Sequence, residues 1–193
     1  MLPRLKTAAL VIALAATAGL AAFAGTRDEA SMPASQAGTA APDFTGIDRW
    51  HNSAPLTLGQ LRGKVVLVDF WTYSCINCIH TIPYVKEWDR KYRDQGLVVV
   101  GVHTPEYPFE RDAGNVADAI RRFGIRYPVA QDNRYDTWRA YGNQYWPALY
   151  LIDASGKVVY TRYGEGAYDK TEAAIRDALA QAGEGPKGAT RTQ

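Results

Sequence analysis

The stretch "WTYSCINCIH", residues 71–80, contains the only two cysteines of the 193-residue chain, Cys75 and Cys78. Two cysteines at this spacing can form a reversible dithiol–disulfide couple, half of a metal site or a structural crosslink. Zinc needs four ligands, and the three histidines do not form a pair at zinc-motif spacing. A crosslink across so short a loop hardly constrains the unfolded chain. The pattern therefore favours a redox couple.

The cysteines follow a predicted strand and open a predicted helix. The run "KVVLVDFW" (64–71) is short, apolar and rich in valine, which is typical of a strand buried on both faces, and "LVVVGVH" (97–103) reads the same way. Between them, residues 76–93 carry apolar side chains at helical spacing, and we expect Pro83 to kink this helix. Strand, helix and strand in this order predict a right-handed crossover between parallel strands.

This placement gives the two cysteines different chemistry. Cys75 falls at the N-terminus of the helix, where the aligned peptide dipoles favour a thiolate. Cys78 follows one turn later and is positioned to attack a mixed disulfide formed at Cys75.

The rest of the chain adds further alternating elements. We predict a helix over 112–123, a strand over 127–130, a short helix over 134–141, strands over 148–153 and 157–163 joined by a turn at Gly156, and a last helix from Asp169 to about Ala182. This order predicts an α/β sandwich whose sheet is parallel first and antiparallel at the end.

The two ends of the chain differ from the middle in composition. Residues 1–24 have a basic start and an apolar run that ends in a small-x-small pattern, which predicts a secretory signal peptide or, alternatively, a membrane anchor that tethers the chain through residues 8–24. Residues 25–42 are small and polar and read as a flexible linker, and 183–193 read as a disordered tail. The folded domain is therefore expected over 43–182.

Charge excludes one class of partner. Removing residues 1–24 removes Arg4, Lys6 and no acidic residue, which leaves 20 Lys+Arg against 20 Asp+Glu. A neutral domain is not expected to bind nucleic acid.

Several motifs together resemble a known family. Strand, W-x-x-x-C-x-x-C, kinked helix and a hairpin preceded by proline resemble the thioredoxin fold. "FWTYSCINC" (70–78), "GVHTPEYPFE" (101–110), "GNV" (114–116) and "YWPALYLID" (145–153) are similar to TlpA-like proteins and to the thioredoxin-like domain of DipZ-type proteins. The resemblance implies a three-layer sandwich with a mixed central sheet, helices on both faces and a TlpA-like insert around 104–131.

The resemblance also implies roles for the residues at the cysteine pair. Cys75 is expected to be the attacking, solvent-facing cysteine and Cys78 the buried resolving one. Asp69 matches the buried acid of the strand, and burial should raise its pKa until it exchanges a proton with Cys78 near neutral pH. The alternative for Asp69 is an acid at the strand end that reaches solvent.

Three further residues complete the predicted site. Pro147 matches the family's cis-proline, and the backbone of Trp146 is then expected to pair with an extended substrate. Trp71 is expected to pack beneath the cysteine pair and is grouped with these residues as part of the substrate site. In the insert, Glu106 and Glu110 could line the rim of the site, but a solvated face is the expected role of both.

Other readings stay open. Thr72-Tyr73-Ser74-Cys75 also spells the T-x-x-C order of peroxiredoxins, although Val68 stands where those proteins need proline. A copper chaperone would bind the metal through both thiolates and His103. The alternative for His103 is a buried structural role. A pure interaction module would not need Cys75. His80, two residues after Cys78, is expected to be a surface histidine.

The sequence thus predicts an exported thiol–disulfide oxidoreductase, in the periplasm or at the outer face of the cytoplasmic membrane. It would reduce disulfides of extracytoplasmic proteins and receive electrons from a membrane-embedded donor. Dithiol–disulfide exchange needs no cofactor, and none is expected.

Overall fold

The computed structural model describes residues 38–183. The predicted signal or anchor segment, most of the predicted linker and the predicted tail beyond Gly183 lie outside the described residues. Within the described part of the chain, no helix has both the length and the apolar character needed to cross a membrane.

The helices and strands follow the predicted order. They are β1 (Arg49–His51), β2 (Val65–Trp71), α1 (Ile76–Tyr92), the short 3-10 helix η1 (Arg93–Gln95), β3 (Leu97–His103), the 3-10 helix η2 (Pro108–Arg111), α2 (Ala113–Phe123), β4 (Val129–Gln131), α3 (Asp136–Ala140), β5 (Ala148–Ile152), β6 (Val158–Tyr163) and α4 (Tyr168–Gly183). Helix α1 continues through Pro83.

The strands of residues 38–183 form one six-stranded mixed sheet in the order β1-β4-β3-β2-β5-β6. Strands β2, β3 and β4 are parallel, and β1, β5 and β6 each run antiparallel to their neighbours. The register pairs Trp71 with His103 and His103 with Gln131, so the carboxyl ends of the parallel strands meet at one edge. In open α/β sheets, this edge is where binding and catalytic sites gather.

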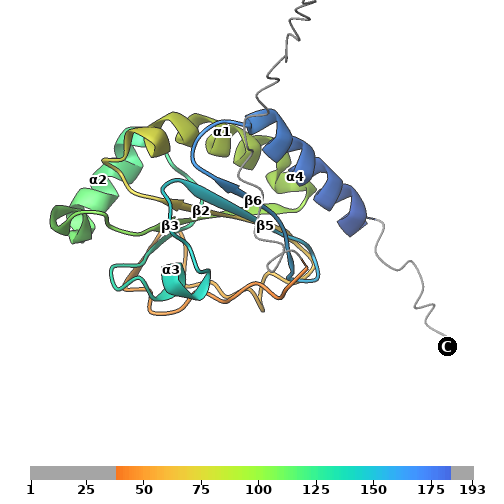
Figure 1. The fold of residues 1–193 in the computed structure, drawn as a ribbon, viewed down its shortest axis with the longest axis horizontal. Coiled ribbons are helices and arrows are strands. Elements are labelled where there is room, and N and C mark those ends of the chain that lie inside the picture. Colours follow the sequence, from red (N-terminus) through yellow and green to blue (C-terminus); the bar gives the residue numbers. More distant parts are fainter. Residues whose placement is uncertain (1–37, 184–193) are drawn as a thin grey trace, which may run out of the picture.

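Helices cover both faces of the sheet (Figure 1), as the resemblance implied. One core contains side chains of α1, α2 and α4 against one face, among them Val85, Ile120 and Ile175. A second core packs Trp138 of α3 and Phe44 against the other face. Because β2 lies between both cores, all seven of its residues are buried. The predicted three-layer α/β sandwich of thioredoxin type is therefore confirmed.

Strand β1 has no counterpart in the sequence prediction. It has only three residues, none of them fully buried, so it lacks the apolar signal that marked β2 and β3. Pairing with β4 supplies its hydrogen bonds, and Asn52 after it donates to the carbonyl oxygens of Ile125 and Tyr127. Long-range contacts rather than local propensity form this strand.

The described chain enters the domain along β6. The amide of Gly38 donates to the carbonyl oxygen of Val158, and that of Val158 to the carbonyl oxygen of Thr39, at 2.9 and 3.0 Å. Ala40 forms a bridge with Lys157 beside the β5–β6 turn. The last residues of the predicted linker therefore lie against the edge strand of the sheet.

The double-sided burial of β2 can be tested with two matched valines. Val68 is fully buried, whereas Val159 on β6 is 42% exposed. We expect Val68→Ala to lower the free energy of unfolding by about 2 kcal/mol, since two buried methyl groups are lost and a cavity remains. Val159→Ala should change it by less than about 0.5 kcal/mol. Urea unfolding of both variants measures the difference, and equal losses would contradict this account of the core.

Candidate active site

The cysteine pair lies where the carboxyl end of β2 meets the N-terminus of α1. Cys75 is the residue that precedes the first turn of α1, in an extended conformation, and its carbonyl oxygen accepts from the amide of Ile79 at 3.0 Å. Cys78 lies one turn further along the helix. Cys75 is partly exposed, Cys78 is buried, and both thiols are free.

The surroundings of Cys75 favour its thiolate. A hydrogen bond from the Cys78 thiol, followed by the N–H groups of Cys78 and Asn77, lowers the pKa of Cys75 to about 6 against the opposing effects of partial burial and the Glu106 charge. The ordinary value is 9.0. A nucleophilic thiolate is thus available at neutral pH.

Cys78 has the opposite character. Only 1% of its surface is exposed, and burial, together with the Cys75 hydrogen bond and the charges of Cys75 and Asp69, raises its pKa far above the ordinary value. Cys78 therefore remains a protonated thiol until a base accepts its proton.

Asp69 lies in the interior of β2, as the resemblance implied, and does not reach solvent. Its exposure is 1%, and burial raises its pKa from 3.8 to about 7. Its Oδ1 atom has no hydrogen-bond partner in residues 38–183. A carboxyl group with this pKa can accept and return a proton near neutral pH.

The Trp146–Pro147 peptide bond is cis, in line with the resemblance. The Cys75 thiol points to the Trp146 carbonyl oxygen, with 4.0 Å between sulfur and oxygen. The Trp146 indole donates to the Thr104 carbonyl oxygen at 3.0 Å and packs against Trp138 at 4.1 Å between ring centroids. The backbone that precedes Pro147 is therefore held directly beside the attacking sulfur.

Trp71 occupies a different place from the predicted substrate surface. Its side chain is fully buried in the core that also contains Cys78, with its ring edge against His103. Packing behind the cysteine pair is therefore correct for Trp71, but contact with substrate is not, since β2 ends beneath the surface.

Glu110 corrects the expectation of a solvated face. It is fully buried, and its carboxylate accepts from the Ser74 hydroxyl at 2.5 Å and from the amides of Glu106 and Tyr107 at 2.6 and 2.8 Å. Burial alone would raise its pKa, but these donors and the Thr72 hydroxyl hold the pKa below the ordinary value. Glu106 is exposed, as expected.

The Glu110 contact joins the insert to the active-site loop. The Tyr73 hydroxyl donates to the Phe109 carbonyl oxygen at 3.1 Å, and the Tyr107 and Phe109 rings stack at 5.6 Å. Tyr107, Phe109 and Tyr145 are about half exposed beside the cysteine loop and are called the aromatic rim below. The sequence analysis did not predict that Ser74 and Tyr73 contact the insert. The nearest signal in the sequence was Glu110, three residues after the start of a Pro-containing turn at 107–110.

The histidines do not form a metal site with the thiols. His103 is fully buried, and burial lowers its pKa to about 4, so it is neutral. Its Nε2 lies 3.3 Å from the Thr72 hydroxyl, and Tyr73 stacks on its ring. Within the described chain, no group of three or more His, Cys, Asp or Glu side chains could hold a metal ion. His80 is a surface residue paired with Glu165 at 3.0 Å.

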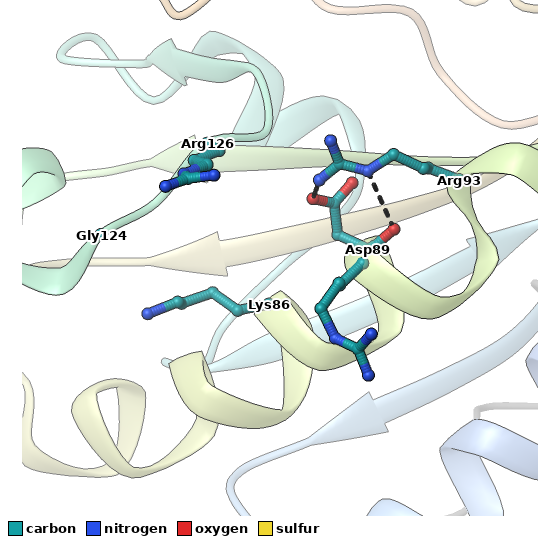
Figure 2. Close-up of a pocket in the computed structure, with 6 residues that line it drawn as sticks. Lys86, Asp89, Arg93, Gly124 and Arg126 are labelled. Carbon is teal, nitrogen blue, oxygen red and sulfur yellow. Dashed lines mark hydrogen bonds and ion pairs between the residues drawn. The ribbon is translucent and has the colours of Figure 1, made fainter.

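A pocket of 510 Å³ lies elsewhere, between α1 and the loop after α2 (Figure 2). Its lining residues are Lys86, Asp89, Arg90, Arg93, Gly124 and Arg126. It contains none of the predicted site residues.

With this geometry in view, comparison with known proteins identifies the family. The Redoxin family pattern matches residues 36–179. The chain belongs to the Redoxin family. It is an oxidoreductase of thioredoxin-like fold.

Individual relatives agree with this assignment. Protein DipZ of Mycobacterium bovis is 54% identical over 150 residues, which cover 76% of this chain and 22% of DipZ. The chain thus spans about a fifth of the length of that relative. The thiol-disulfide oxidoreductase YkuV of Bacillus subtilis is 33% identical over 141 residues, covering 72% of this chain and 94% of YkuV. The solution structure of an oxidised thioredoxin-like protein matches with a TM-score of 0.68 and 31% identity, over 75% of this chain and 97% of that one.

The role of Cys78 in activating Cys75 can be measured. Cys78→Ala removes the main hydrogen bond to the thiolate, so the pKa of Cys75 should rise from about 6 towards 9.0. The measurement is the pH dependence of Cys75 alkylation, with the thiolate absorbance as a second readout. Cys75→Ala is the control and should show no titration near this pH. An unchanged titration midpoint in Cys78→Ala would contradict the assignment.

The raised pKa of Asp69 predicts a dependence of stability on pH. Between 3.8 and about 7 the folded protein retains a proton that the unfolded chain loses, so the free energy of unfolding falls as pH rises through this window. At about 1.4 kcal/mol per pH unit, the loss is on the order of 4 kcal/mol. Asp69→Asn should therefore be more stable than the wild type at about pH 8 and similar to it at about pH 4.

Urea unfolding at both pH values tests this prediction. Asp153→Asn is the control, because hydrogen bonds from Lys157 and Ser155 lower the pKa of Asp153 against its burial, and its removal should destabilise the protein at about pH 8. An Asp69→Asn variant without a pH-dependent gain would rule out the buried neutral carboxyl.

Proposed function

We propose that the protein works outside the cytoplasmic membrane and reduces disulfides of exported proteins. The observation that carries the proposal is a partly exposed Cys75 of low pKa, beside the Trp146 carbonyl oxygen, with a buried thiol one turn behind it. The predicted signal or anchor segment in residues 1–24 supports the location. The similarity to YkuV, named as a thiol-disulfide oxidoreductase, supports the chemistry.

In the first step the Cys75 thiolate attacks one sulfur of the substrate disulfide. A bond forms between Cys75 and that sulfur, the substrate S–S bond breaks, and the other substrate sulfur leaves as a thiolate that takes a proton from water. The helix N-terminus lowers the pKa of Cys75, so the thiolate needed for this attack is present at neutral pH.

In the second step Cys78 resolves the mixed disulfide. Its thiol gives a proton to the Asp69 carboxylate, and its sulfur attacks Cys75, so that the Cys75–Cys78 bond forms and the substrate thiolate leaves. Two electrons have then passed to the substrate, and the protein is a disulfide. Asp69 suits this step because its pKa of about 7 lets both protonation states exist at neutral pH.

Substrate recognition is assigned to the backbone before Pro147 and to the aromatic rim. The Trp146 carbonyl oxygen faces Cys75, so an extended segment that pairs with this backbone brings its cysteine to the nucleophile. Ile76, Tyr107, Phe109 and Tyr145 are exposed around it. These apolar side chains suit a disulfide that becomes accessible in an unfolded or loosely folded segment.

Return to the dithiol needs two electrons from another protein. A membrane-embedded dithiol donor fits this requirement, because it can pass electrons by the same exchange reaction to a protein on the outer side of the membrane.

Trapping of mixed disulfides in native cells tests the proposal. In Cys78→Ser the first step occurs but the second does not, so exported proteins should accumulate in disulfide linkage to Cys75. Cys75→Ser, the matched control, should trap none. We also expect the Cys75–Cys78 pair of the wild-type protein to be mainly reduced in cells. After the outer layers of the envelope are opened, a thiol reagent that cannot cross the cytoplasmic membrane should therefore label Cys75.

Two outcomes would contradict the proposal in different ways. Labelling of Cys75 only after lysis would mean that the protein lies on the cytoplasmic side of the membrane. Equal trapping by the two serine variants, or none by either, would mean that Cys75 does not carry out exchange with exported proteins.

A further inference from the structure

Two hydrogen-bond donors lie buried beside Asp69 without an acceptor. They are the indole Nε1 of Trp71 and the hydroxyl of Tyr127, and neither atom has a partner in the described residues. Trp71 is fully buried and Tyr127 is 2% exposed. Buried polar groups of native proteins are nearly always paired, so two orphaned donors next to an orphaned carboxyl oxygen call for an explanation.

Gly101 brings these groups together. It is the residue of β3 that pairs with Asp69 of β2, so the two face the same side of the sheet. A Cβ atom on Gly101 would lie 3.0 Å from Trp71 Nε1 and 3.2 Å from the Tyr127 ring. Both aromatic side chains therefore pack closely over the glycine that borders Asp69, and a larger residue at this position would have to displace them.

The chemistry of the two groups is suited to an anion. The indole N–H can only donate. Burial, followed by the charges of Asp69, Asp89 and Cys78, raises the pKa of Tyr127 well above its ordinary value, so its hydroxyl also keeps its proton. The three acids that act on Tyr127 include both groups that exchange a proton in the resolving step.

Other charged groups nearby are already engaged. Asp89 of α1 is ion-paired with Arg93 and lies at the wall of the pocket in Figure 2, with its carboxylate turned to that guanidinium. Lys86 donates to the Phe123 carbonyl oxygen. His103, against the Trp71 ring, is neutral. Asp69 and Cys78 are thus the groups whose negative charge is left for the two donors to stabilise.

We propose that the Trp71 indole N–H and the Tyr127 hydroxyl form a donor pair that stabilises the negative charge on Asp69 and Cys78 during the resolving step. Trp71 and Tyr127 are then positioning residues, because they act through the acid and do not touch the substrate. The inference rests on the proposed exchange chemistry of the Cys75–Cys78 pair.

One negative charge moves from group to group during the resolving step. Before the step the charge is on the Asp69 carboxylate; proton transfer leaves Asp69 neutral and Cys78 as a thiolate, and the attack on Cys75 then passes the charge to the departing substrate sulfur. Donors fixed beside both groups before the reaction stabilise the charge without having to reorient, which is the property of an oxyanion hole.

The test is the titration of Asp69 in the oxidised protein, where neither cysteine titrates. In the full-length chain with carbon-13 in its aspartate carboxyl groups, NMR should give a pKa near 7 for the wild type. Tyr127→Phe removes one of the two donors proposed to stabilise the charged carboxylate, so the midpoint should move upward by about one pH unit. The Trp71 indole N–H resonance should titrate with the Asp69 midpoint in the wild-type protein.

Tyr141→Phe is the matched control. The Tyr141 hydroxyl is also buried without a partner in residues 38–183, but it belongs to the core on the opposite face of the sheet. Its loss should leave the Asp69 midpoint unchanged. Since each variant removes only an unpaired hydroxyl, both should fold, and thermal unfolding of the two checks this.

The proposal fails if Tyr127→Phe titrates like the wild type, if Tyr141→Phe shifts the midpoint equally, or if the indole resonance does not respond. These measurements use no substrate. A failed trapping experiment would therefore refute the proposed function, whereas an unchanged titration would refute only the donor pair.

Discussion

A carboxyl group in the middle of a strand that is covered on both faces determines how the rest of the site is built. Every residue of β2 is buried, and Asp69 shares this interior with valine, leucine and phenylalanine side chains. The charged form of this carboxyl group lowers the stability of the fold, and burial therefore raises its pKa. As a result, Asp69 can accept and return a proton near neutral pH. Cys78, one helical turn behind the nucleophile, depends on that property to lose its own proton.

Asp69 and Glu110 show that burial alone does not set the charge of an acid. Both are almost completely buried, yet the pKa of Asp69 is raised and that of Glu110 is lowered. The difference is in their donors: Glu110 accepts from Ser74 and two backbone amides, whereas Asp69 Oδ1 accepts from no residue in the described chain. Glu110 is therefore a permanent anion with a structural task, and Asp69 is a titrating one.

The sequence predicts the parts of this protein that depend on local patterns. Strands β2 and β3 and helix α1 follow from apolar runs and helical spacing, and the burial of Asp69 follows from its place inside such a run. Strand β1 and the contact between Ser74 and Glu110 depend on partners 80 and 36 residues away, respectively, and short polar segments carry no signal for them. The prediction for Trp71 was correct in its position behind the cysteines and wrong in its contact with substrate. The sequence alone does not show whether an aromatic residue at the end of a strand is exposed or buried.

The point at which the chain enters the domain has a geometric consequence. Residues 38–41 run along β6 beside the β5–β6 turn, while β5 begins directly after Pro147, next to Cys75. Since β5 runs away from the cysteine pair, its far end and the entering chain lie at the opposite pole of the sheet. A tether attached upstream would hold the protein by the end remote from its nucleophile. The reactive face would then be directed outward, free to meet large partners without steric hindrance from the attachment.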